Sequence, residues 1–204
     1  TIVKSSPNSE MISVLFFMHG WGGSKKGYKE IISEFGDDFT IVILQAPYSM
    51  GWFSGKFSWY DWQIVDGDTT SNQEQINFSS QSVLRTIDHI VRKENLDIKN
   101  VFIGGQSQGA IMACKLASEH PRSMRGFIAH NGRLPVVFDP VDGDDFSKLH
   151  GLVMNGKYDK VLPPKYAESI VNKFKNLGVN IDSISPAIGH GMPKESQRII
   201  QEWI

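Results

Sequence analysis

The chain has 204 residues, of which 40% are hydrophobic and 21% charged, as in a globular domain with a full core. The 21 basic and 22 acidic residues leave a formal net charge of −1, which excludes the basic footprint of a nucleic-acid-binding protein and a polybasic membrane patch. No apolar run is long enough to span a bilayer. The chain opens at Thr1 without a recognisable signal peptide, and Cys114 is its single cysteine, so we expect a cytoplasmic protein without disulfides.

The first informative stretch is an apolar strand predicted over residues 11–18, which ends in a glycine-rich loop. This loop reads His-Gly-Trp-Gly-Gly at 19–23, and a helix is expected over 24–35. Glycines at the carboxyl end of a strand let backbone amides turn toward a ligand, so the loop is a candidate donor to an oxyanion. We expect His19 to brace the loop rather than to act as a base.

A strand predicted over 39–44 leads into a long segment, 48–70, which is dense in aromatic residues and interrupted by glycines. The glycines argue against one regular element. Long loops at the carboxyl edge of a sheet often carry function, and aromatic side chains there suit an acyl chain or an aromatic group. Core packing under the loop is an equally good interpretation of any one ring. The candidate substrate-binding residues are Trp52, Phe53, Trp59 and Tyr60.

After a predicted helix over 73–96, residues 97–118 have the pattern of a strand, a tight turn and a helix. The turn, Gly-Gln-Ser-Gln-Gly at 105–109, fits G-x-S-x-G, which places a serine on a strained elbow with its hydroxyl exposed. We expect Gly105 and Gly109 to pack against each other, so that neither tolerates a side chain. The amide of Gln108, at the start of the helix, would face negative charge that develops beside Ser107.

The rest of the chain continues the alternation, with strands predicted over 124–129, 149–154 and 179–184, and helices over 163–177 and from 193 onward. The acidic stretch 138–146 lacks calcium-site spacing and is interpreted as a solvated loop, so no metal site is predicted. This pattern predicts a single α/β domain over residues 1–204, with a mostly parallel sheet covered by helices on both faces.

A serine hydroxyl needs a base to take its proton and an acid to orient that base, and in such folds the chain order is serine, acid, histidine. Among the histidines after Ser107, His120 closes the elbow helix and His150 opens a strand at the wrong edge. His130 ends a strand at the active edge, where we expect it to support the site. His190, just past the last strand, is the best base, and Asp159, which follows the strand before it, is the best acid.

These motifs together resemble the acyl-protein thioesterase and small carboxylesterase family of α/β-hydrolases, also called phospholipase/carboxylesterase. The resemblance covers nearly the whole chain and is carried by His-Gly-Trp-Gly at 19–22, Ala-Pro at 46–47, Trp-Tyr-Asp at 59–61, the elbow at 105–109, Gly-Lys-Tyr-Asp-Lys-Val-Leu-Pro at 156–163 and Gly-His at 189–190. It implies a hydrolase domain without a cap and without a cofactor, with Ser107, Asp159 and His190 as catalytic triad. It also implies that the amides of Trp21 and Gln108 form the oxyanion hole.

The sequence departs from the family pattern at two places beside the triad. Gln106 stands where an aromatic residue is usual, and Lys160 follows Asp159 where proline is common. The departures leave the chemistry intact and the substrate open among S-acylated proteins, lysophospholipids and small esters. The sequence thus predicts a serine hydrolase of carboxylic esters or thioesters. The alternatives are a catalytically silent ligand-binding protein on the same scaffold and a lactonase or peptidase of the same fold.

Overall fold

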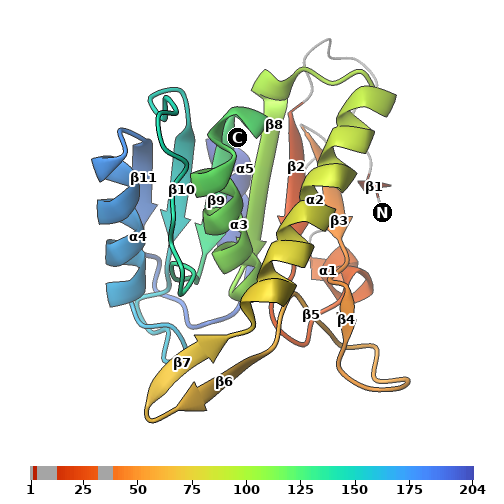
Figure 1. The fold of residues 1–204 in the computed structure, drawn as a ribbon, viewed down its shortest axis with the longest axis vertical. Helices are drawn as coiled ribbons and strands as arrows, with labels where there is room; N and C mark the ends of the chain where they lie inside the picture. The colour runs from red at the N-terminus through yellow and green to blue at the C-terminus, as the bar shows by residue number, and fades with distance from the viewer. Residues whose placement is uncertain (1, 4–12, 32–38) are drawn as a thin grey trace.

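The computed structural model describes residues 2–3, 13–31 and 39–204. Within them, seven strands form one central sheet in the order β1-β3-β2-β8-β9-β10-β11 (Figure 1). Their bounds are β1 Ile2–Val3, β2 Val14–Met18, β3 Thr40–Leu44, β8 Val101–Gln106, β9 Gly126–His130, β10 His150–Met154 and β11 Asn180–Ile184. Only β1, which pairs with β3, runs antiparallel in the described sheet, so the predicted mostly parallel sheet is confirmed.

Helices cover both faces of the sheet, as predicted. One face carries α2 (Gln73–Lys93), α3 (Gln108–Glu119) and α4 (Lys165–Asn176), and the other carries α1 (Lys25–Ile31) and α5 (Lys194–Trp203) (Figure 1). Each face buries its own hydrophobic cluster against the strands. Two short 3₁₀ turns, Ile98–Asn100 and Pro121–Ser123, precede β8 and β9. The predicted strand start at 11–12 and the predicted helix end at 32–35 lie outside the described residues.

The aromatic segment 48–70 is more regular than the sequence suggested. It contains β4 (Tyr48–Ser49) paired with β5 (Phe57–Ser58), and β6 (Trp62–Val65) paired with β7 (Asp68–Ser71), both antiparallel. The turn between β6 and β7 is Asp66-Gly67, and both residues have positive φ, 53° and 87°. Positive φ at both central residues is the type I′ geometry that joins two-residue hairpins. The glycines at 51, 55 and 67 therefore mark turns and a loop, not an absence of strands.

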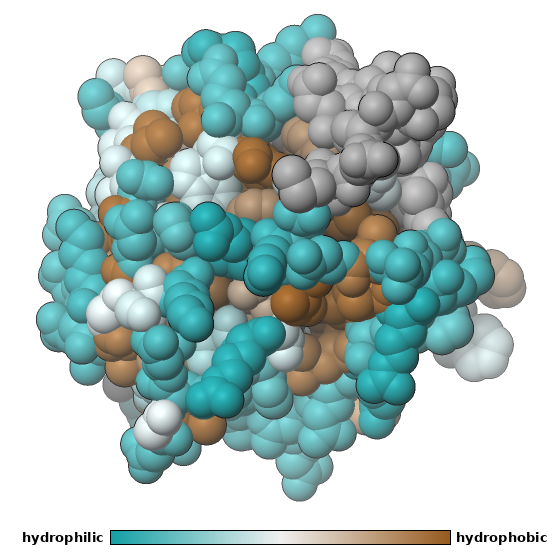
Figure 2. Space-filling view, turned by 90° about the horizontal axis from the view of Figure 1, so that it is seen from above, coloured by the Kyte–Doolittle hydropathy of each residue, from teal (hydrophilic) through white to brown (hydrophobic). Residues whose placement is uncertain are grey.

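The carboxyl ends of the parallel strands point to one edge of the sheet, and the β6–β7 hairpin projects beyond that edge (Figure 1). Figure 2 looks onto the opposite edge, where polar side chains dominate the rim and hydrophobic ones show between them. Among the described residues, no helix combines the length and the apolar character that a membrane span requires. The edge with the carboxyl ends is the one on which the chemistry-bearing residues predicted from the sequence converge.

Candidate active site

Ser107 lies at the predicted elbow between β8 and α3. Its backbone has φ 56° and ψ −116°, a strained conformation for a residue with a side chain, which lifts the hydroxyl clear of the strand. A Cβ on Gly105 would lie 2.3 Å from the carbonyl carbon of Gly109, and one on Gly109 would lie 2.1 Å from the carbonyl oxygen of Met18. The two glycines therefore pack as predicted, because a side chain on either would collide with backbone.

Three side chains from three different strand ends form one hydrogen-bonded chain. The Oγ of Ser107 lies 2.9 Å from Nε2 of His190, and Nδ1 of the same ring lies 2.7 Å from Oδ2 of Asp159. These are hydrogen-bond distances, and the order hydroxyl, imidazole, carboxylate is that of a serine nucleophile with its base and orienting acid. The structure thus brings together all three residues that the sequence selected.

The carboxylate of Asp159 is held from its other side. Its Oδ1 accepts hydrogen bonds from the backbone amides of Val161 and Leu162, at 2.8 and 2.9 Å, and the side chain is fully buried. Amide donors at one oxygen fix the carboxylate plane, so that the second oxygen faces the imidazole. The His190 side chain is about one quarter exposed, so part of it is accessible from solvent.

The glycine-rich loop after β2 lies directly beside the nucleophile. A Cβ on Gly20 would be 3.3 Å from the Cβ of Ser107, so the loop approaches the serine closely because residue 20 has no side chain. The next residue is Trp21, and the backbone amide of Gly22 donates a hydrogen bond to the carbonyl of Phe57 in β5 at 2.9 Å. Across the described residues, neither the Trp21 amide nor the Gln108 amide donates a hydrogen bond within the protein. Both remain candidates for the oxyanion hole.

His19 braces this loop, as expected. It is completely buried, its Nδ1 lies 2.8 Å from the carbonyl of Gly20, and its Nε2 accepts from the amide of Ala46 at 3.2 Å. Burial lowers the pKa of His19, because the charged imidazolium is poorly solvated there, although the bond to Gly20 opposes the shift. A neutral ring with its proton on Nδ1 satisfies both contacts.

The side chain of Gln108 has a structural role in addition to its backbone amide. Its Oε1 accepts from the amide of Trp59 at 2.9 Å, and its Nε2 donates to the carbonyl of Tyr60 at 2.8 Å. The indole of Trp59 donates to the carbonyl of His19 at 2.8 Å. The residue after the nucleophile therefore anchors the segment that follows β5 against the elbow and the loop.

The structure contradicts two of the four predicted aromatic substrate-binding residues and gives no support to the other two. Trp59 and Tyr60 are only 1% and 2% exposed, so both rings are core residues that offer no surface to a ligand. Trp52 and Phe53 extend into solvent in the loop between β4 and β5, 94% and 101% exposed. From the sequence, the size of a ring and its position in a loop could not distinguish a buried core residue from an exposed residue at the tip of the loop.

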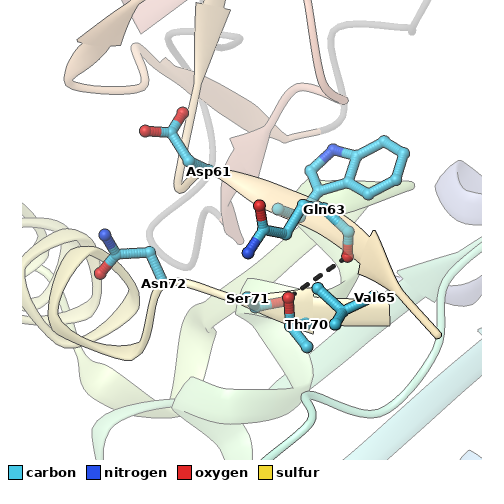
Figure 3. A pocket seen from close by; sticks show the side chains of 7 residues that line it. Asp61, Gln63, Val65, Thr70, Ser71 and Asn72 are labelled. Atoms are coloured by element: carbon cyan, nitrogen blue, oxygen red, sulfur yellow. Dashed lines mark hydrogen bonds between the residues drawn. The ribbon is translucent and has the colours of Figure 1, made fainter. Parts of the chain in front are cut away.

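Two other tryptophans stand beside the oxyanion loop, and sequence analysis did not select them as substrate contacts. The rings of Trp21 and Trp62 meet edge to face at a centroid distance of 6.0 Å, and about half of each residue is exposed. Trp62 begins β6, and it also lines a pocket of about 510 Å³ along the hairpin (Figure 3). The other residues lining the pocket are Asp61, Gln63, Val65, Thr70, Ser71 and Asn72. The pocket is mixed in polarity and contains no triad residue.

His130, which the sequence placed in a supporting role, lies beneath the triad. Its backbone carbonyl accepts from the amide of Ser107 at 2.9 Å, and its ring is completely buried. Neither ring nitrogen has a hydrogen-bond partner among the described residues. Burial lowers the pKa of His130 to about 3, helped by the neighbouring His190 and opposed by the charge of Asp159.

This buried imidazole predicts that acid destabilises the fold. In the unfolded chain the imidazole of His130 becomes protonated below pH ~6.5, whereas in the folded protein it stays neutral down to about pH 3. The stability that this neutral imidazole allows above pH ~6.5 is therefore lost as the pH falls between these two values. Urea unfolding at pH 7.0 and 4.5 should show that His130→Phe removes about 2–3 kcal/mol of the pH-dependent loss of unfolding free energy.

The matched control is His89→Phe on the exposed face of α2, which should leave the wild-type difference unchanged. An equal pH dependence of unfolding in wild type and His130→Phe would refute the assignment of this loss of stability to His130.

Within the described ranges, no group of three or more His, Cys, Asp or Glu residues is placed to hold a metal ion. The residues at the carboxyl edge of the sheet are thus a serine that is hydrogen-bonded to an imidazole and, beside it, two candidate amide donors.

Comparison with known proteins shows similarity in sequence and in fold over most of the chain. A protein of Dictyostelium discoideum named acyl-protein thioesterase 1 homolog 1 is 24% identical over 217 aligned residues, which cover 100% of this chain and 96% of that protein. The fold is similar to a carboxylesterase from Mesorhizobium loti, with TM-score 0.78, 19% identity, and 94% and 87% of the two chains covered. It is also similar to Zea mays acyl-protein thioesterase 2, with TM-score 0.76, 17% identity, and 100% and 96% covered.

Residues 2–204, nearly the entire chain, match the sequence profile of one family. The chain belongs to the phospholipase/carboxylesterase family of α/β-hydrolases.

Proposed function

We propose that the protein is a serine hydrolase that cleaves carboxylic esters or thioesters through an acyl-enzyme intermediate. The observation that carries this proposal is the unbroken chain from the Ser107 hydroxyl through His190 to the buried carboxylate of Asp159, at 2.9 and 2.7 Å. A hydroxyl in this setting can lose its proton to the imidazole as it attacks a carbonyl carbon.

In the acylation half-reaction, Nε2 of His190 accepts the Ser107 proton while Oγ bonds to the substrate carbonyl carbon. The resulting oxyanion accepts hydrogen bonds from the amides of Gln108 and Trp21. Asp159 keeps the proton on Nδ1 and stabilises the imidazolium that forms. The same imidazolium then protonates the departing alcohol or thiol as the bond to the leaving group breaks, leaving an acyl group on Ser107.

Deacylation repeats these steps with water as the nucleophile. His190 takes a proton from the water, the water oxygen attacks the acyl carbon, and the Ser107 oxygen leaves with the proton returned to it. The products are a carboxylic acid and the free enzyme. The steps use only the side chains and amides described above.

The proposed substrates carry an apolar acyl group, which suits the half-exposed pair Trp21 and Trp62 beside the oxyanion loop. S-acylated proteins and lysophospholipids fit this chemistry, as do small esters, and the family relationship supports all three classes. Thioesters and oxygen esters share the attacked carbonyl carbon, so the triad alone does not separate them.

A fluorophosphonate probe tests the proposal directly. It should label the protein on Ser107, as identified by peptide mass spectrometry, and labelling should abolish hydrolysis of chromogenic short-chain esters. The competing idea, a silent binding protein on the same scaffold, predicts neither ester turnover nor labelling. A folded protein that the probe leaves unlabelled, or labels at another serine with activity retained, would overturn the proposal.

A further inference from the structure

The loop that carries His190 is held by side-chain amides at three successive carbonyl groups. It lies between β11 and α5, it has no regular structure, and glycine flanks the histidine on both sides, so its own backbone restrains it little. The carbonyl of His190 accepts from Nε2 of Gln106 at 2.7 Å. The carbonyls of Gly189 and Gly191 accept from Nδ2 of Asn131 at 3.1 and 3.2 Å.

Gln106 links this loop to the loop after β2. It is the last residue of β8, only 7% exposed, and it precedes the nucleophile. Its Oε1 accepts from the hydroxyl of Tyr28, and that hydroxyl accepts from the amide of Gly20 at 3.2 Å. Burial raises the pKa of Tyr28, so the hydroxyl stays protonated and available as the donor.

Asn131 links the same loop to the acid. It directly follows β9, it is completely buried, and its φ of 49° lies in the left-handed region that asparagine tolerates better than most residues. Its Oδ1 accepts from the amide of Gly156 at 2.8 Å, three residues before Asp159. One amide therefore holds the histidine loop and the acid loop at a fixed separation.

We propose that Gln106 and Asn131 are positioning residues that clamp the backbone at 189–191 and so hold the His190 imidazole between Ser107 and Asp159. This role rests on the proposed function, because it concerns the base of that reaction. Neither residue touches the reacting atoms. Gln106 couples the base to the oxyanion loop, and Asn131 couples it to the acid.

The size of the effect follows from the geometry that the reaction needs. Nε2 has to lie within hydrogen-bond reach of Oγ while Nδ1 stays on the carboxylate, and a displacement of about 1 Å can cost a hundredfold in rate. Removing one of the two amides leaves the other in place, so each single variant should lose roughly ten- to a hundredfold in kcat. KM should change little, because the acyl group is bound elsewhere.

The test variants remove the side-chain N–H donors of Gln106 and Asn131 while keeping side chains of similar size and shape. Gln106→Met removes the amide at similar length, and Asn131→Asp keeps the Oδ1 acceptor for Gly156 but puts an oxygen against two carbonyls. Gln106→Glu, which keeps the acceptor for Tyr28, is the second variant at that position should the methionine variant not fold. The matched control is Gln73→Met, whose amide donates to Asn77 on the exposed face of α2.

Two measurements decide the outcome. Steady-state kinetics on a short-chain ester should give the fall in kcat at near-constant KM. Proton NMR should show the far-downfield resonance of the His190 Nδ1 proton, identified by its loss in His190→Gln, weakened or broadened in the variants but not in Gln73→Met. Folded variants with wild-type kcat and an unchanged resonance would overturn the role.

The NMR measurement does not depend on turnover. If the wild-type protein neither hydrolyses esters nor reacts with fluorophosphonate, the proposed function fails, and the resonance still decides whether the two amides hold the ring. If the wild-type protein is active and the variants lose only thermal stability, the proposed function stands and the positioning role is refuted.

Discussion

Replacing Ser107 with alanine should lower kcat for ester hydrolysis about a millionfold, because nothing else at the site can form the acyl-enzyme. Alanine keeps the Cβ of residue 107 and removes only the hydroxyl, so the fold and the hydrogen bond between His190 and Asp159 should persist. The comparison requires purified protein and a chromogenic ester at saturating concentration. We expect a residual rate above the uncatalysed rate in buffer, because substrate binding and the oxyanion amides still contribute to catalysis.

The control for this change is Ser147→Ala, an exposed serine in the loop before β10, which should retain full activity. A second variant, Ser107→Gly, should be equally inactive yet more stable to urea by about 1–2 kcal/mol, because glycine adopts a φ of 56° without strain. More than a hundredth of the wild-type kcat in both Ser107 variants would mean that another residue is the nucleophile.

The fold and the triad could be predicted because their signals are local and their meeting point follows from topology. The elbow needs only five residues, and glycine spacing reports the close packing of Gly105 against Gly109. Parallel strands place their carboxyl ends at one edge, so residues that follow β8, β10 and β11 had to meet there. The long separations from Ser107 to Asp159 and His190 therefore did not matter.

The aromatic segment could not be resolved in the same way. Trp59 and Tyr60 pack into the hydrophobic core, and their backbone groups are held by the side chain of Gln108, a partner about fifty residues away that the sequence does not reveal. The β6–β7 hairpin did carry a signal, since Asp66-Gly67 between two β-prone runs is typical of a type I′ turn. Because the segment is so rich in aromatic residues, the pattern of two β-prone runs joined by a turn was not recognised in the sequence.

The clamp on the histidine loop illustrates a different limit. Gln106 appeared in the sequence only as a departure from an aromatic residue, and Asn131 only as a polar residue after a strand. Their partners are 84 and about 60 residues further along the chain, and they are carbonyl groups, which every residue has. A contact of a side chain with distant backbone leaves no pattern of residue types to read.

Replacing Asp159 with asparagine should lower kcat about ten-thousandfold while leaving Ser107 and the fold intact. The amides of Val161 and Leu162 donate to Oδ1, so the asparagine carbonyl should turn to them and its NH₂ group should face Nδ1 of His190. The ring then accepts at Nδ1 and carries its proton on Nε2, where it can no longer accept the proton of Ser107.

Stopped assays at several pH values, with Asp88→Asn on the exposed surface of α2 as matched control, separate this effect from a general loss of charge. Asp88→Asn should keep full activity, because its carboxylate pairs only with Arg92 in the described structure. Fluorophosphonate labelling of Asp159→Asn should slow in proportion to kcat, since the same proton transfer activates Ser107 toward the probe. A loss of less than tenfold in both assays would mean that the Gln106 and Asn131 amides orient the His190 imidazole without the help of the carboxylate.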